Sequence, residues 1–188
     1  GTNSFNLVWE KVCAEIMNNQ LDTRLGALKL PIPLRDKYNR QEKLIDIIEK
    51  PLWIVTGKTA ADTLIPDIVS TSLINGEWHF IIFDAKYYNA KLELDTIPKG
   101  QPGIESVTKQ YLYQLAYQEF IGEHEFSVVT NCFLMPTEEA DTVDKESVSL
   151  QMLSKLGLES IKVRFLPAIM AYESYLSGRK LDLSLLKL

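Results

Sequence analysis

The chain has 188 residues, 46% of them hydrophobic and 24% charged, which is the composition of an ordinary globular protein and excludes a largely disordered or fibrous one. Its formal net charge of −5 argues mildly against nucleic-acid binding, because such proteins neutralise phosphates with basic residues; an acidic metal site and local basic patches weaken that objection. No apolar run is long enough to cross a bilayer, so we expect no membrane insertion.

The length predicts a single domain spanning 1–188, with a core large enough to fold without disulfides. The two cysteines, Cys13 and Cys132, lie in apolar stretches without metal-ligand spacing, which predicts two reduced, packed thiols and a cytoplasmic location. Because the first residue is glycine rather than methionine, we expect a fragment of a longer polypeptide.

The first predicted element is an amphipathic helix. Apolar residues recur at helical spacing from Ser4 to Asn19, and Ser4 can serve as the N-cap. Glu10 lies at the edge of the apolar stripe, where it is either solvated or directed into a neighbouring cleft. Further along, the pattern predicts a helix over residues 42–49 and a short strand over 52–56, followed by a turn.

A β-hairpin is the most specific prediction. Two β-rich runs flank Asn75-Gly76, the dipeptide that best suits a two-residue type I′ turn. If Ile74 and Glu77 border that turn, counting back along both strands fixes the register. The pairs that result form one mostly apolar face: Leu73 with Trp78, Thr71 with Phe80, and Val69 with Ile82.

Three charged residues extend this face. The next pair in the same register is Asp67 with Asp84, and Lys86 projects to the same side because it lies two residues beyond Asp84. The same counting places His79 opposite Ser72 on the other side of the hairpin, so we interpret His79 as structural. Two carboxylates and an ammonium group are thus predicted to meet beside an apolar surface.

The rest of the chain is predicted to alternate between helix and strand. We expect a lysine-bearing loop over 89–102, a helix over 104–121, a strand over 126–134 ended by Pro136, an acidic loop over 137–146, strands over 147–153 and 161–166, and a final helix starting at Pro167. The apolar stripe of the 104–121 helix is predicted to contain Ile104, Val107, Tyr111, Leu112 and Leu115, leaving Lys109, Gln110, Tyr113 and Gln114 largely outside it.

The predicted cluster has the composition of a phosphoryl-transfer site. Facing carboxylates lie about 4.5 to 5.5 Å apart at Cβ, where their repulsion destabilises a sheet unless something offsets it. Few, hard oxygen ligands suit Mg²⁺, which completes its shell with waters and phosphate oxygens, and a nearby lysine such as Lys86 can orient the attacking water. Singly, Asp67 can be a turn residue and Asp84 with Lys86 a surface ion pair; their joint position favours catalysis.

The sequence resembles a known motif at this point. Ile65-Pro66-Asp67 followed by Asp84-Ala85-Lys86 resembles the PD-(D/E)xK nuclease motif, and longer blocks are similar to LlaJI-type restriction endonucleases and the related McrC-like nuclease subunits. Those blocks are residues 5–10, 83–88, 101–103 and 108–111. The resemblance implies an α/β, restriction-endonuclease-like core, in which a central mixed β-sheet is flanked by α-helices, and a single nuclease domain over 1–188.

The resemblance also implies roles for individual residues. Asp67 and Asp84 are expected to hold Mg²⁺, with Mn²⁺ as a substitute, and Lys86 to act on the attacking water. Glu10 matches an acidic residue that helps bind the metal directly or through water, and Gln110 matches a glutamine close to the site. For Glu10 the alternative is a solvated helix residue, and for Gln110 a plain helix-surface position.

The expected function is Mg²⁺-dependent endonuclease cleavage of double-stranded DNA, as the cleavage domain of a restriction enzyme. The alternatives are a repair or recombination exonuclease of the same fold and a non-catalytic DNA-binding or assembly domain. The sequence contains no helix-turn-helix, zinc finger or Walker-type loop, so we expect a separate recognition domain or an NTPase partner subunit. Cutting both strands needs two centres, which favours a homodimer.

Overall fold

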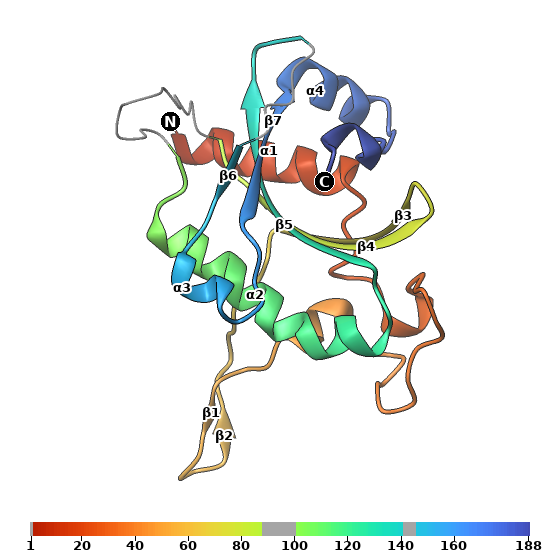
Figure 1. Cartoon of the computed structure of the whole chain (residues 1–188), viewed down its shortest axis with the longest axis vertical. Coiled ribbons are helices and arrows are strands. Elements are labelled where there is room, and N and C mark those ends of the chain that lie inside the picture. Colours follow the sequence, from red (N-terminus) through yellow and green to blue (C-terminus); the bar gives the residue numbers. More distant parts are fainter. Residues whose placement is uncertain (1, 88–100, 141–145) are drawn as a thin grey trace.

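The computed structural model describes residues 2–87, 101–140 and 146–188, and its centre is a five-stranded mixed sheet of order β3-β4-β5-β7-β6 (Figure 1). The strands are β3 (Ile68–Ile74), β4 (Glu77–Ala85), β5 (Val128–Thr137), β6 (Glu146–Val148) and β7 (Ile161–Pro167). β4, β5 and β7 run parallel, whereas β3 and β6 pair antiparallel at the two edges. This arrangement confirms the α/β class with a central mixed sheet.

Helices flank both faces of the sheet. The α-helices are α1 (Thr2–Ile16), α2 (Ile104–Glu123), α3 (Gln151–Ser154) and α4 (Ala168–Leu176), and short 3₁₀ turns occur at Leu25–Ala27, Leu44–Ile47 and Leu183–Leu186. The packing clusters place α1 and α4 on one face and α2 on the other. No helix among the described residues is long and apolar enough to cross a membrane.

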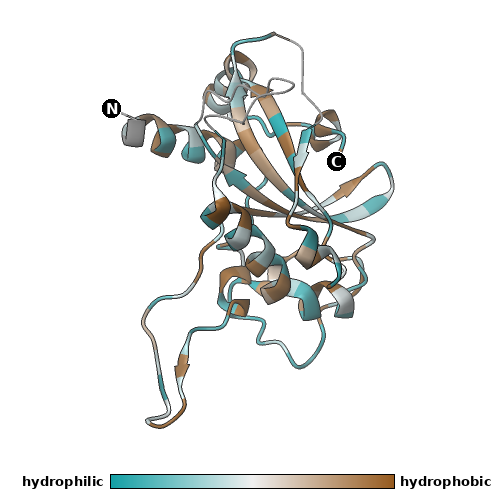
Figure 2. Cartoon of the chain, turned by 60° about the vertical axis from the view of Figure 1, so that its left-hand side comes forward, coloured by the Kyte–Doolittle hydropathy of each residue, from teal (hydrophilic) through white to brown (hydrophobic). Residues whose placement is uncertain are grey.

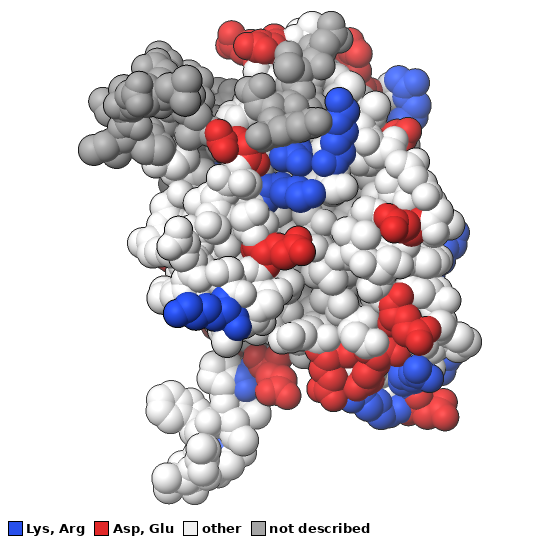
Figure 3. All heavy atoms as spheres, in the orientation of Figure 1, with Lys and Arg blue, Asp and Glu red and all other residues white. Residues whose placement is uncertain are grey.

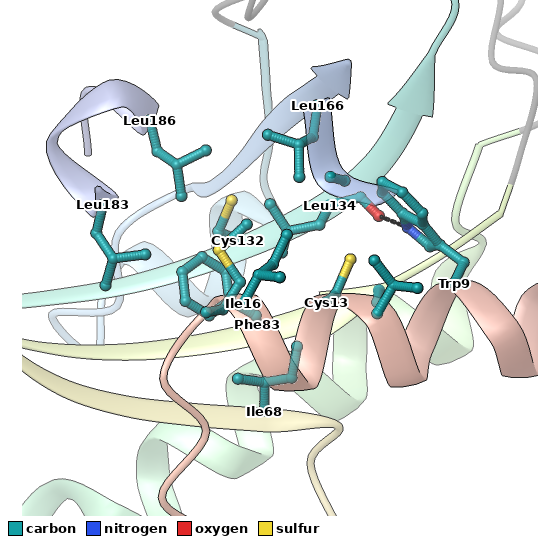
Figure 4. Packing of buried hydrophobic residues seen from close by; sticks show 14 of the residues in the cluster. Trp9, Cys13, Ile16, Ile68, Phe83, Cys132, Leu134, Leu166, Leu183 and Leu186 are labelled. Carbon is teal, nitrogen blue, oxygen red and sulfur yellow. Dashed lines mark hydrogen bonds between the residues drawn. The ribbon is translucent and has the colours of Figure 1, made fainter. Parts of the chain in front are cut away.

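On the α1 face, every second side chain of the strands projects into a hydrophobic core (Figure 4). Ile68 and Phe83 of the β3–β4 hairpin belong to the same cluster as Trp9 of α1, and all three are fully buried. The Trp9 indole N–H donates to the Leu134 carbonyl at 3.1 Å, which ties α1 to β5. Both cysteines are buried free thiols, as expected.

The α2 face holds an aromatic cluster. Phe80 of β4 lies 5.1 Å, ring centre to ring centre, from Tyr117 of α2, and Phe120 packs beside both. The Tyr117 hydroxyl donates to the Leu44 carbonyl at 3.0 Å, so it also anchors the 3₁₀ turn at Leu44–Ile47. These large rings fix the rotation of α2 on the sheet.

The hairpin register is confirmed. Asn75 and Gly76 have φ angles of 49° and 81°, as a type I′ turn requires, and every pair from Ile74–Glu77 to Ile68–Phe83 matches the prediction. His79 faces Ser72 and is buried. The last pair of the ladder is Ile68 with Phe83, so Asp67 lies directly before β3 rather than inside it.

Several predicted boundaries are wrong. Ser4 lies inside α1 rather than at its N-cap, and the 42–49 helix is only the 3₁₀ turn at Leu44–Ile47. β5 continues through Pro136 because β4 has already ended there, so the missing N–H removes no bond to that neighbour. The 147–153 strand divides into β6 and α3, and the 52–56 strand into β1 (Leu52–Trp53) and the turn leading to β2 (Lys58–Thr59).

Two predicted loops lie partly outside the described residues. Of the 89–102 loop only 101 and 102 are described, and of the acidic 137–146 loop positions 141–145 are not described. The final helix begins directly after Pro167, as predicted.

Phe83→Ala should destabilise the chain by about 3–5 kcal/mol, because it leaves a cavity in the α1-side core that the packed sheet cannot close. Urea denaturation followed by circular dichroism measures the change. The matched control, Ile169→Ala on α4, removes a side chain that is 70% exposed and should shift stability by no more than about 0.5 kcal/mol. Equal effects of the two changes would contradict the proposed core.

Candidate active site

Asp67 and Asp84 meet where the hairpin opens. The backbone N–H of Ala85 donates to Asp67 Oδ2 at 3.1 Å, which holds the Asp67 carboxylate across the end of the ladder. The two side chains lie close enough for the charge of Asp67 to act on the Asp84 carboxyl group. The pairing predicted from the turn therefore continues through side chains after the backbone ladder has ended.

Asp84 has the most perturbed carboxyl group of the site. The residue is 6% exposed, and burial raises its pKa from 3.8 to about 8, with its interactions with Asp67 adding to the effect and Lys86 opposing it. Asp84 is therefore largely protonated at neutral pH, because ionising it beside a second carboxyl group in a dry site needs a compensating charge.

Lys86 supplies part of that compensating charge. Its Nζ lies 2.9 Å from Asp84 Oδ1. Burial disfavours its charged form, but the carboxyl groups of Asp84, Asp67 and Glu10 outweigh that effect and raise the Lys86 pKa. The backbone N–H of Lys86 donates to the Leu134 carbonyl at 2.9 Å, so the residue is held on β5 just past the end of β4.

Glu10 reaches the same region from α1. Burial, followed by the charge of Asp67, raises its pKa, while Lys86 and a hydrogen bond from Asn6 lower it. Asn6 donates to Glu10 at 2.9 Å and accepts from the Tyr87 backbone at 3.0 Å, so it joins α1 to the segment that follows Lys86. Asn6 was not predicted as a site residue, although its spacing of four from Glu10 is visible in the sequence.

Gln110 corrects the prediction for α2. It is fully buried, as is most of Tyr113, whereas Ile104 and Leu112 are 66% and 42% exposed. The predicted stripe is right at Val107 and Tyr111 and wrong at Ile104, Leu112 and Leu115. The buried side is wider than predicted, because Tyr113, Tyr117 and Phe120 bury their rings on the sheet and Gln110 lies between them and Val107. Its amide donates to the Ile82 carbonyl at a long 3.4 Å.

The donor set fits a hard divalent cation. Gln110 Oε1 is a buried oxygen that accepts no hydrogen bond within the described part of the chain, which is costly unless another group satisfies it, and the buried Asp84 Oδ1 has the Lys86 ammonium group beside it. All candidate ligands are oxygens, as Mg²⁺ prefers. Within residues 2–87, 101–140 and 146–188, no three His, Cys, Asp or Glu side chains are arranged around one ion position, so direct ligation by Glu10 stays a prediction.

Tyr113 was missed by the sequence analysis as a positioning residue. Its hydroxyl donates to the Ile65 carbonyl at 3.2 Å, which fixes the segment leading into Asp67. Burial, together with the charges of Asp84 and Asp67, raises its pKa to about 12, so it remains a donor. The signal available in the sequence was the helical spacing of Tyr113 with Tyr117 and Phe120.

Two other residues have local roles. Lys109 is paired with Glu105 one turn earlier on α2, at 2.6 Å, and both are exposed. His124 is fully buried at the end of α2, accepts from the Arg35 backbone and packs on Phe120, so it is structural.

The raised pKa of Asp84 predicts how stability depends on pH. Between 3.8 and about 8 the folded chain retains a proton that the unfolded chain has lost, so the free energy of unfolding should fall as pH rises through that window. Asp84→Asn, which cannot ionise, should show a flatter profile. Urea denaturation without divalent cations from pH 5 to 8.5 measures both; parallel profiles would contradict the shift.

Comparisons with known proteins identify the family of the chain. The family model described as LlaJI restriction endonuclease matches residues 34–170, which include Asp67, Asp84, Lys86 and Gln110 but not Glu10. The chain is 25% identical over 183 residues, 95% of its length, to the "Type II restriction enzyme BsuMI component YdjA" of Bacillus subtilis (strain 168), and it spans 34% of that relative. No solved structure matches significantly. Because the family match covers well over half of its residues, the chain belongs to the LlaJI restriction endonuclease family.

Proposed function

We propose that this chain is the cleavage domain of a restriction enzyme and hydrolyses phosphodiester bonds of double-stranded DNA with Mg²⁺ as cofactor. One observation carries the proposal: in a member of a restriction endonuclease family, Asp67 is held by the backbone N–H of Ala85, next to Asp84, and Lys86 Nζ lies 2.9 Å from Asp84 Oδ1 at the end of the hairpin. The spacing and the side chains are those of the PD-(D/E)xK motif.

Asp67 and Asp84 are the proposed metal ligands, with Glu10 contributing directly or through a water molecule. When bound, Mg²⁺, or Mn²⁺ in its place, lowers the pKa of a coordinated water and neutralises charge on the phosphate. The buried, unsatisfied Gln110 Oε1 and the buried carboxyl group of Asp84 support this assignment. Binding has to displace the proton that Asp84 holds at neutral pH, so metal affinity should increase as pH rises toward 8.

Lys86 and Gln110 complete the proposed centre. Lys86 keeps its charge and lies against Asp84, where its ammonium group can donate to the attacking water or to an oxygen of the phosphate under attack. Gln110 of α2 donates to the carbonyl of Ile82, two residues before Asp84 on β4, and presents a free carbonyl oxygen among the described groups. It orients either the ligand set or a water.

Further components are part of the proposal. The relative is named as a component of a type II restriction enzyme, which supports a partner subunit or a separate recognition domain for sequence specificity. A homodimer would bring together the two centres that a double-strand cut needs. A cytoplasmic location is in keeping with two free thiols.

Lys86→Ala and Asp84→Asn should each lower the rate of Mg²⁺-dependent plasmid cleavage by about 10²-fold or more, because each removes charge placed where the transition state needs it. Gel analysis of supercoiled plasmid, with Mg²⁺ or with EDTA, measures the rate. Conversion to open or linear forms also separates an endonuclease from an exonuclease, which cannot start on a closed circle.

The matched control is Lys155→Ala, an exposed lysine on the segment after α3, which should cut at the parental rate. If Lys86→Ala cleaves as well as the parent protein, the role assigned to that lysine is wrong. Cleavage that persists in EDTA would remove the metal from the mechanism.

Gln110→Leu tests whether Gln110 acts in the site or only fills space. Replacing a buried, half-satisfied amide with an apolar side chain of similar size should leave the urea midpoint unchanged or raise it. Cleavage should nevertheless fall by about tenfold or more if the amide orients a reacting group. A variant that is stable and fully active would assign Gln110 to packing alone.

A further inference from the structure

The segment 50–60 forms an arm that projects from the body of the protein. It contains β1 and β2, and Figures 1 and 2 both show it extending away from the sheet. All residues from 51 to 59 are exposed, among them four consecutive large apolar residues. Their exposures are 59% for Leu52, 68% for Trp53, 89% for Ile54 and 99% for Val55.

The arm is fixed at its base. Ala60 N–H donates to the Pro51 carbonyl at 2.8 Å, and the Thr63 hydroxyl donates to the Glu49 carbonyl at 2.6 Å. At the tip, Gly57 has a φ of 68° and its N–H donates to the Trp53 carbonyl at 2.8 Å. An isolated two-stranded hairpin is only marginally stable in water, so an exposed apolar tip on such an arm needs a partner to cover it.

The charge of the arm favours a polyanion as that partner. Residues 50–60 include Lys50 and Lys58 and no acidic residue, although the whole chain has a formal net charge of −5. Figure 3 shows the arm as an almost uncharged projection from a surface with many acidic groups. An apolar tip with lysines at its flanks is suited to a duplex, in which phosphates border a groove whose polar base edges are interspersed with the apolar methyl groups of thymine.

The arm also leads directly to the proposed centre. The chain passes from β2 through Ile65 into Asp67, and the Tyr113 hydroxyl clamps Ile65 to α2. Ile65 is itself 63% exposed. A duplex placed with a phosphate at Asp67 and Asp84 would therefore meet the segment from which the arm projects.

We propose that the arm enters the major groove of the substrate duplex and places Trp53, Ile54 and Val55 against base edges, while Lys50 and Lys58 bind phosphates. This inference rests on the proposed nuclease function. The groove admits a two-stranded ribbon, and its thymine methyl groups suit aliphatic side chains.

A second copy of this chain fits the arm less well. A stable protein interface buries about 800 Å² on each partner, and a ribbon whose strands have two residues each presents a narrow tip rather than a broad patch.

Fluorescence anisotropy of a labelled duplex, titrated with the whole chain in EDTA, tests the proposal without cleavage. The triple change Trp53→Ala, Ile54→Ser and Val55→Ser should raise the Kd by about tenfold or more, as loss of interface anchors does. Lys58→Ala should weaken binding to all sequences and reduce the slope of log Kd against log salt by about one. With Mg²⁺ present, the triple variant should raise KM far more than it lowers kcat.

The matched control is Ile169→Ser with Leu176→Ser, two exposed apolar residues on α4, at the opposite end of the molecule in Figure 1. It should bind and cleave like the parent, and all variants should keep the parental urea midpoint because the arm lies outside the core. If the parent binds DNA and the triple variant binds within twofold of it, the inference is overturned while the nuclease function stands. The same holds if the variant loses only self-association in sedimentation. A parent chain that neither binds nor cuts DNA would overturn the proposed function and this inference with it.

Discussion

The contact between the Asp67 and Asp84 carboxyl groups depends on the hairpin register, and the rest of the site is arranged around it. Strand side chains alternate between the two faces, so a slip of one residue at the turn would move Asp84 away from α2 and into the α1-side core. The Asn75-Gly76 turn therefore determines both which apolar side chains pack on each face and which charged groups meet. Lys86, Tyr113 and Gln110 are arranged around a carboxyl pair whose position depends on this turn at the other end of the hairpin.

Much of this hairpin could be predicted from the sequence because its determinants are local. A turn that needs positive φ at two positions has few sequence solutions, and once it is placed, counting determines which side chains face each other. The same local argument found His79 opposite Ser72 and the helix start after Pro167. The proximity of Asp67, Asp84 and Lys86 could be predicted because the three residues lie in or next to one pair of neighbouring strands.

What failed depends on contacts between elements distant in the chain. The rotation of α2 is set by tyrosine and phenylalanine rings packed on the sheet, and a hydropathy pattern counts tyrosine as half polar, so it exposed Tyr113 and Gln110 and buried Leu112. Pro136 was read as a strand end because its tolerance depends on where β4 stops, which the local sequence does not reveal. Asn6 and Tyr113 escaped notice because their roles exist only once α1 and α2 dock.

The two helix layers meet the site from opposite faces of the sheet, Glu10 from α1 and Gln110 from α2. Neither layer alone assembles the complete group. Under the proposed function, a partly folded chain with one helix undocked lacks part of the centre and should not cleave DNA. The architecture thus makes docking of both helices a condition for the proposed activity.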